Sequence, residues 1–490
     1  WIEWRESTKK GKPKGVALTG TITQKSILEY WHVLAWCLDT QAPVPLLQGL
    51  VRDWSLVLDT DAFMRAELPE KHRKMISPIV SWARRHFPKE AAAGRLMSNV
   101  AGFRCAYRLR LTSAPGVVSS GEEDLGTTLE IANRPVAGHE KAPGWAKIEA
   151  LIKQVREDWK TPAGDLIEFA IHKWKWQFEL SAGFYNEQVW PDAQDLANRR
   201  GVALNQAQWM IDTAKQHKKL KSEYSGELRE WIEKKGRPGL DTPWLIGGSF
   251  LRHGAKEVGD ADLYELWRDM KNLEFKGIDR VPLNRAVKVC SYKVDAAVEW
   301  VKNEVPQGEG ALIWVWNIAL GRWVTETLRK HGIPALYAGA GQGKMFLDPG
   351  NHKRVIVTRI KSHGEGRNLQ AWGNQMVLQW PRSPVWAQQM LGRCHRPGQT
   401  RDHLVVRTVN TTLFDRENYS ACLNDATYVQ ATTGDSQKII TAQYDPFPIY
   451  FTSQALRERG FADVKLLTDE QRQMLEERYG GGVKRQERDA

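Results

Sequence analysis

The residues from 389 to 399 combine side chains that could bind a phosphate group. Their sequence is Gln389-Met390-Leu391-Gly392-Arg393-Cys394-His395-Arg396-Pro397-Gly398-Gln399. Arg393 and Arg396 are three positions apart, so on a helix both side chains would project from one face. Each guanidinium offers rigid, permanently charged donors that suit phosphate oxygens, and Gly392 lets a ligand or another backbone approach closely. We interpret this run as a phosphate site; a solvated basic helix face is the alternative.

A second polar segment follows the strand-like run at 355–357. It reads Thr358-Arg359-Ile360-Lys361-Ser362-His363-Gly364-Glu365-Gly366-Arg367-Asn368-Leu369. Gly364 and Gly366 free the backbone to turn sharply and expose its amide groups. Lys361, Ser362 and Arg367 supply further partners for phosphates. The segment predicts contacts to a phosphate backbone, with a polar loop that binds nothing as the alternative.

Both segments resemble motifs of superfamily II helicases. The pattern Q-x-x-G-R-x-x-R ending in H-R-P-G-Q is similar to motif VI, and its ending is most similar to the Swi/Snf-type, remodeller-like branch. Residues 358–369 resemble motif V, matching at Gly364, Gly366, Asn368 and Leu369 but departing at Glu365 and Arg367. Leu18-Thr19-Gly20-Thr21 resembles motif III, with Ile22 where the branch usually has proline. Residues 313–317 resemble motif IV, and Gln379 stands near the place where remodellers carry an aspartate.

The resemblance implies a role for each matching residue. Arg393 and Arg396 would stabilise charge on the phosphate that is transferred from ATP, as arginine fingers do. A nucleotide-binding or coupling role would fall to Gln389, Gly392, Gly364 and Gly366. Contacts to the nucleic-acid backbone would come from Thr19, Thr21, Ser362, Arg367 and Asn368. The implied partner is DNA, in duplex form and bound without sequence preference, and such binding weakens steeply with salt.

The sequence lacks the phosphate loop and the acidic box of this family. Residues 339–344 (Gly-Ala-Gly-Gln-Gly-Lys) resemble a phosphate loop, but that motif needs a glycine at the position of Ala338 and a hydroxyl residue at that of Met345. In the family both missing motifs precede motif III, and the chain begins at Trp1. We therefore expect a fragment without most of the first ATPase lobe, inactive alone, with ATP and Mg²⁺ held mainly by that lobe. No metal site is predicted within the chain itself.

The spacing of apolar runs in residues 285–430 predicts the elements that would position these residues. Strands are expected at 287–292, 311–316, 334–338, 354–358, 376–379 and 404–409, and helices at 294–302, 321–331 and 385–391. Such alternation predicts an α/β fold with a doubly wound parallel sheet, whose ligands bind beyond the carboxyl ends of the strands. By resemblance this is a RecA-like lobe, the helicase C-terminal domain.

The rest of the chain divides into three further regions. We expect residues 1–39 to be a C-terminal remnant of the first RecA-like lobe and residues 431–490 to be an extension with a disordered tail. Residues 40–284 predict a large, mainly helical insertion rich in tryptophan, with helices at 145–159, 163–180 and 226–235 and a strand-like run at 104–111. Its tryptophans fit core packing, with base stacking as the alternative. The lysines at 215, 218, 219 and 221 fit a solvated helix face.

Composition narrows the class of protein. The net charge of +12 favours a polyanionic partner, and residues 351–410 hold ten basic groups against two acidic ones. Five scattered cysteines without a C-x-x-C pair fit the reducing cytoplasm of a bacterial or phage-infected cell. No apolar stretch is long enough for a membrane span.

The sequence thus predicts the C-terminal part of an ATP-dependent DNA helicase or translocase. One alternative is a non-catalytic nucleic-acid-binding protein that uses residues 351–410, and another is an autonomous nucleotide hydrolase that uses Lys344.

Overall fold

The computed structural model describes residues 26–59, 70–115, 117, 125–165, 167, 170–237, 239–364 and 366–444. Thr19, Thr21 and the C-terminal tail lie outside these described residues. The chain forms two compact units. Unit 1 combines the described residues up to Ala137 with those from Lys293 onward, and unit 2 is Gly138–Tyr292. Among the described helices, none combines the length and apolar character needed to cross a membrane.

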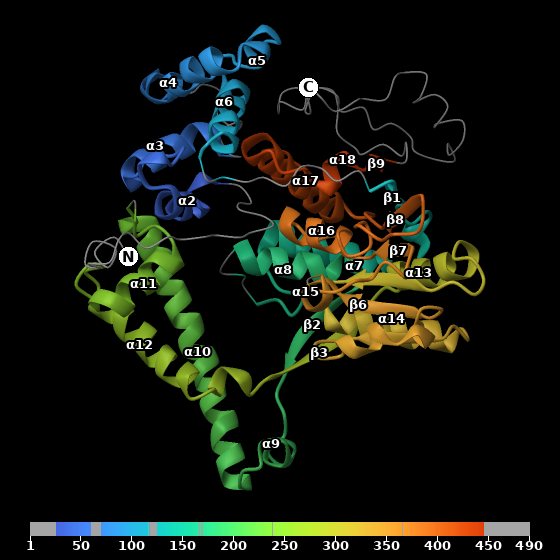
Figure 1. Ribbon diagram of the computed structural model, residues 1–490. Helices are drawn as coiled ribbons and strands as arrows, with labels where there is room; N and C mark the ends of the chain where they lie inside the picture. The colour runs from blue at the N-terminus through green and yellow to red at the C-terminus, as the bar shows by residue number, and fades with distance from the viewer. Residues whose placement is uncertain are drawn as a thin grey trace, which may run out of the picture. The chain divides into compact units, whose positions relative to one another are not determined.

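A parallel sheet of seven strands forms the centre of unit 1 (Figure 1). The strand order is β5-β6-β4-β7-β8-β1-β9, and every neighbouring pair is parallel. The strands are β1 (Thr128–Asn133), β4 (Ala311–Val315), β5 (Ala335–Ala338), β6 (Val355–Arg359), β7 (Asn374–Val377), β8 (His403–Thr408) and β9 (Gln443–Tyr444). The helices around them are α13 (Tyr292–Asn303), α14 (Ile318–Lys330), α15 (Ile360–His363), α16 (Pro384–Leu391), α17 (Leu413–Thr433) and α18 (Lys438–Thr441).

The predicted doubly wound α/β fold is confirmed. The chain leaves β4 towards β5 through α14 and leaves β7 in the other direction through α16, so right-handed crossovers place these helices on opposite faces. Figure 1 shows α14 on one side of the strands and α16 and α17 on the other. Every residue of β4 is buried, as expected for a parallel strand covered on both faces. Trp314 and Trp372 are fully buried in the same core.

Two strands differ from the sequence-based expectation. Strand β1 lies within the range predicted as a helical insertion, yet it pairs with β8 from Thr128↔His403 to Asn133↔Thr408 and with β9 on its other side. The strand expected at 287–292 is instead β3 (Leu283–Lys288), which pairs antiparallel with β2 (Phe184–Val189) in unit 2 and takes no part in the large sheet.

The N-terminal part of unit 1 is a helical layer with a core of its own. It contains η1 (Ile27–Glu29), α2 (Trp31–Leu38), η2 (Asp39–Gln41), α3 (Gln48–Leu58), α4 (Glu70–His86), α5 (Pro88–Ala92) and α6 (Val100–Thr112). The strand-like run predicted at 104–111 is wrong because it lies inside α6. The Asn99 side chain caps this helix at the Gly102 amide, and Phe103 and Tyr107, one turn apart, are both fully buried.

The described residues of unit 2 form helices, the β2–β3 pair and the loops between them. Its helices are η4 (His139–Lys141), α7 (Trp145–Lys153), the π-turn η5 (Gln154–Asp158), α8 (Ala170–Leu180), α9 (Ala193–Arg200), α10 (Leu204–Lys235), α11 (Pro243–His253), α12 (Ala261–Phe275) and η6 (Ile278–Arg280). The helix predicted at 226–235 is only the last third of α10, which is 32 residues long. Met210, Ile211 and Ala214 on one face of α10 are buried in a cluster with Leu196 and Ile278.

Candidate functional site

The loops that follow β4 and β7 leave the sheet in opposite directions, which marks the switch point of a doubly wound sheet. The side chain of Gln379 occupies this point and is fully buried. Its Oε1 accepts hydrogen bonds from the backbone amides of Trp316 and Asn317, each 3.1 Å away. The position that resembles the remodeller aspartate therefore carries a neutral acceptor that joins two strand ends.

Aromatic and basic side chains lie beside Gln379 at the switch point. The Nζ atom of Lys361 is 4.6 Å from the ring centroid of Trp316, whose ring meets that of Trp386 edge to face at 6.1 Å. The Nε of Arg359 donates to the carbonyl of Trp316 at 3.2 Å. The sequence pattern placed Trp316 in a buried strand and in the run that resembles motif IV. Its position beyond the end of β4 cannot be seen until the strand register is known.

The two motif VI arginines lie in a turn and not on a helix. Helix α16 ends at Leu391, and Gly392 caps it, so the expectation that Arg393 and Arg396 project from one helical face is wrong. The Arg393 side chain folds back instead, and its Nε donates to the carbonyl of Gln389 at 3.1 Å. The turn, and not helical spacing, determines where the two guanidinium groups lie.

This turn is bound to the end of the motif V segment. Nη1 of Arg393 donates to the carbonyl of Arg367 at 3.3 Å, and Nη1 of Arg396 donates to Oδ1 of Asn368 at 2.5 Å. The amide of Leu369 donates to the carbonyl of Arg393 at 3.0 Å. The structure thus brings together four predicted site residues from two separate segments.

The glycines of the motif V segment act at the end of α15. Gly364 caps the helix through its amide, which donates to the carbonyl of Ile360 at 2.7 Å, and a side chain at Gly364 would collide with that carbonyl. Gly366 has a φ of +69°, a left-handed conformation that favours glycine. Ser362 is half-buried within α15. The two glycines therefore redirect the chain from β6 towards Arg367 and Asn368.

Gln389 and Gly392 are placed at the end of α16. The backbone carbonyl of Gln389 holds Arg393, whereas its side-chain Oε1 is buried and has no hydrogen-bond partner among the described residues. A Cβ atom at Gly392 would lie 3.0 Å from the carbonyl of Gln388 and 3.6 Å from Cε of Lys438. The glycine therefore serves close packing within the lobe.

The loop at 339–344, which follows β5, is already filled by protein contacts. The amide of Gly339 donates to Oε1 of Gln342 at 2.7 Å, and Nε2 of His363 donates to the Gly339 carbonyl at 2.8 Å. Burial lowers the pKa of His363, so this ring is neutral at pH 7. The guanidinium of Arg367 lies directly over Gly343, where a Cβ would be 2.1 Å from Nη2. These contacts disfavour the loop as a phosphate cradle.

A further contact, which no pattern in the sequence indicates, fixes the motif VI turn. Nε2 of His395 lies 2.8 Å from the carbonyl of Thr127, just before β1, and Nδ1 lies 3.2 Å from Nζ of Lys438. Burial lowers the pKa of His395, which favours a neutral ring that donates from Nε2 and accepts at Nδ1. This contact could not be predicted from the sequence, because it depends on the pairing of β1 with β8.

Comparison with known proteins finds similarity among solved structures. No family model and no curated protein matches the chain. Among solved structures, T4 UvsW aligns with 9% identity and a TM-score of 0.23 over 28% of this chain and 32% of that one. The C-terminal part of the Fun30 ATPase domain aligns with 12% identity and a TM-score of 0.30 over 63% of this chain and 99% of that one. The chain thus spans about a third of the UvsW chain. Similarity at this level does not define an activity, so the functional inference depends on the residues described above.

Proposed function

We propose that this chain is the arginine-bearing, DNA-contacting part of an ATP-dependent DNA helicase or translocase. The observation that carries the proposal is the junction of two segments at Arg393, Arg396, Arg367 and Asn368. Each segment resembles a helicase motif in sequence, and the two meet at residues to which the resemblance gives roles. An unrelated basic loop has no reason to combine both patterns at one place.

The junction suits charge stabilisation during phosphoryl transfer. Arg396 is held by the neutral amide of Asn368, so this contact orients its guanidinium without neutralising it. Arg393 is held by the carbonyls of Gln389 and Arg367, which fix its direction. Preorganised positive groups of this kind stabilise the charge that develops on the transferring phosphoryl group. A phosphate loop and Mg²⁺ ligands are proposed to come from a second lobe. No group of three His, Cys, Asp or Glu residues in the described ranges could hold a metal, and we assign no Mg²⁺ ligand here.

The same junction offers a route from DNA binding to ATP hydrolysis. Ser362, Arg367 and Asn368 would contact the DNA backbone, and the turn that contains Gly364 and Gly366 would let phosphates reach backbone amides. Because Arg367 and Asn368 also hold the two arginines, displacement of this segment by DNA would move the guanidinium groups. DNA-stimulated ATP hydrolysis is the activity that such a connection supports.

The test is the DNA-stimulated ATPase activity of the complete gene product that contains this chain. Arg393→Ala is expected to lower kcat by about 10³-fold or more, with a small change in KM, because the guanidinium acts on the transition state. Arg382→Ala is the matched control, since this arginine is exposed in the same lobe. Full ATPase activity of Arg393→Ala would contradict its role as an arginine finger. A parent protein without ATPase activity, whose DNA binding is salt-sensitive and unaffected by ATP, would favour the non-catalytic alternative.

The isolated 490-residue chain provides a second arm of the test. It is expected to show no ATP turnover, because half of the catalytic groups would be absent. Turnover by the chain alone that disappears in Lys344→Ala would contradict the shared site and favour the loop at 339–344 as an autonomous nucleotide site.

A further inference from the structure

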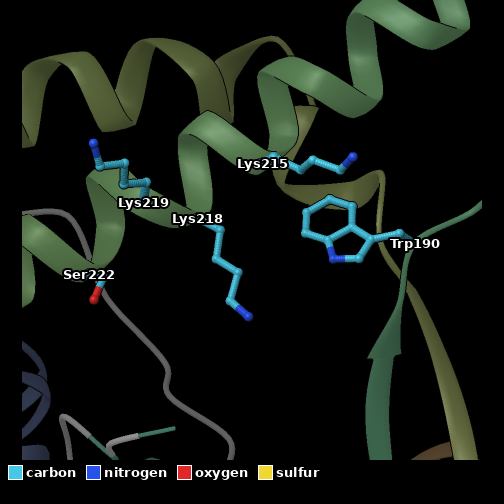
Figure 2. A pocket seen from close by; sticks show the side chains of 5 residues that line it. All are labelled: Trp190, Lys215, Lys218, Lys219 and Ser222. Atoms are coloured by element: carbon cyan, nitrogen blue, oxygen red, sulfur yellow. The ribbon is translucent and has the colours of Figure 1, made fainter.

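Unit 2 contains a cavity of about 350 Å³ on the outer face of α10 (Figure 2). It is lined by Trp190, Lys215, Lys218, Lys219 and Ser222. The four α10 residues occupy positions i, i+3, i+4 and i+7, so they lie on one helix face. They extend over roughly 10 Å at 1.5 Å per residue. Trp190 comes from the segment between β2 and α9.

The cavity carries positive charge that the protein scarcely neutralises. Residues 213–222 include four lysines and no acidic residue. No described carboxylate lies within 4 Å of Lys215. Lys218 is 3.8 Å from Asp165 and Lys219 is 3.8 Å from Glu223, in ion pairs whose lysine side chains are 57% and 80% exposed. Exposed pairs at this distance bind weakly, so all three ammonium groups can turn to an anionic ligand.

Helix stability does not explain the lysine cluster. Helix α10 is already fixed in place by Met210, Ile211 and Ala214, which are buried in the cluster with Leu196 and Ile278. A solvated outer face needs polar residues of either sign, whereas like charges at i, i+3 and i+4 cost a few tenths of a kcal/mol each. The cluster therefore opposes folding slightly, as expected for residues that serve binding.

Trp190 adds an aromatic surface to the charged face. One part of the indole packs against the core cluster of α9 and α10, and the rest lines the cavity. In Figure 2 the Lys215 amine lies beside the indole, and the Lys218 side chain extends between the indole and Ser222. A half-buried indole next to several lysines is the arrangement with which proteins bind single-stranded nucleic acids, because lysines hold phosphates and the ring stacks on a base.

We propose that this lysine face, defined as Trp190, Lys215, Lys218, Lys219 and Ser222, binds a single-stranded nucleic acid. The three ammonium groups and the Ser222 hydroxyl contact phosphates, and the indole of Trp190 stacks on one base. A duplex keeps its bases paired and offers no free ring face, so the tryptophan favours a single strand. The site lies in a different unit from Arg393 and needs no ATP, so its failure would leave the proposed ATPase function untouched.

The test measures binding of a fluorescein-labelled thirty-nucleotide oligo-dT to the 490-residue chain by anisotropy at several NaCl concentrations. The variant K215Q/K218Q/K219Q is compared with K234Q/K235Q/K256Q, which removes the same charge from exposed positions elsewhere in unit 2. Each phosphate contact to a single strand contributes about 0.7 to the slope of log K against log salt. The first variant is therefore expected to bind at least tenfold more weakly with a slope lower by about two, whereas the control changes little.

The stacking contact is tested with W190L and W190F. W190L is expected to weaken binding of the oligonucleotide about five- to tenfold and to leave binding of the matching duplex unchanged, whereas W190F retains most of the affinity because a phenyl ring still stacks. Thermal unfolding checks that each variant is folded. Equal losses in both lysine variants, an unchanged salt slope in the first, or equal competition by polyglutamate would overturn the proposal. Equal losses for single strand and duplex in W190L would overturn the stacking contact.

Discussion

Lys293 is a buried lysine whose charge is balanced by an ion pair inside the sheet lobe. Lys293 has no exposed surface, and its Nζ lies 2.8 Å from Oδ1 of Asp415 and 3.0 Å from the carbonyl of Leu378. Burial lowers the pKa of Lys293, and the carboxylate of Asp415 opposes this shift. Asp415 also completes the capping box of α17 with Thr412. One ion pair thus joins α13, the loop after β7 and the start of α17.

Removing only the lysine should be costly. Lys293→Met leaves the Asp415 charge buried without its cation, and we expect a loss of about 3–5 kcal/mol in the free energy of unfolding. Lys293→Met combined with Asp415→Asn should recover more than half of this loss, because the neutral amide keeps an oxygen for the cap. Urea unfolding monitored by circular dichroism measures both. A loss below about 1 kcal/mol in the single variant would contradict a strong pair.

At the scale of elements, local sequence predicted strands and helices well where burial is complete. Strand β4 and the first three residues of β6 are continuous apolar runs, the pattern of strands covered on both faces. Strand β1 was missed because Glu130 interrupts its apolar run, and its partners β8 and β9 come from sequence positions about 270 or more residues later. Helix α6 was mistaken for a strand because Arg-Cys-Ala-Tyr-Arg-Leu-Arg-Leu alternates with a period of two.

The placement of β1 in the sheet can be checked by a cavity substitution. Ile131 is fully buried in the core of the sheet, so Ile131→Ala should lower the free energy of unfolding by about 2–5 kcal/mol. Ile171→Ala is the control, since Ile171 in α8 is 66% exposed and should change stability by less than about 0.5 kcal/mol. Equal small effects at both positions would place Ile131 outside a packed core.

For the candidate site, sequence reasoning selected residues in two motifs but predicted no contact between the motifs. The resemblance selected Arg393, Arg396, Arg367 and Asn368, and the structure brings these four together. Their geometry could not be predicted, because the end of α16 and the contact between two loops depend on tertiary packing. The contacts of His395 with residues at 127 and 438 show the same limit, since no local pattern indicates them.

At the scale of the whole molecule, a polar cluster links the N-terminal helical layer to the sheet lobe within unit 1. Arg104 on α6 donates to the carbonyls of Leu58 and Asp59 at 2.7 and 2.5 Å, and its guanidinium lies 5.0 Å from the ring centroid of Tyr428 on α17. Asp59 accepts from the hydroxyl of Ser26 at 2.5 Å. Residues separated by more than 300 positions in sequence thus share one network, which makes the helical layer part of the same folded body as the sheet.

This network predicts a pH-dependent stability. Burial raises the pKa of Asp59 to about 6 from 3.8, so the folded protein binds a proton more tightly than the unfolded chain does. The resulting stabilisation is complete below about pH 3.8 and is lost as the pH rises through about 6; it amounts to at most about 3 kcal/mol. Compared with the parent, Asp59→Asn should lose less stability between pH 4 and 7 in urea unfolding. Asp212→Asn, at an exposed position on α10, should follow the parent curve. If Asp59→Asn also follows the parent curve, the pKa of Asp59 is the same in the folded and unfolded states, and the network does not retain the proton.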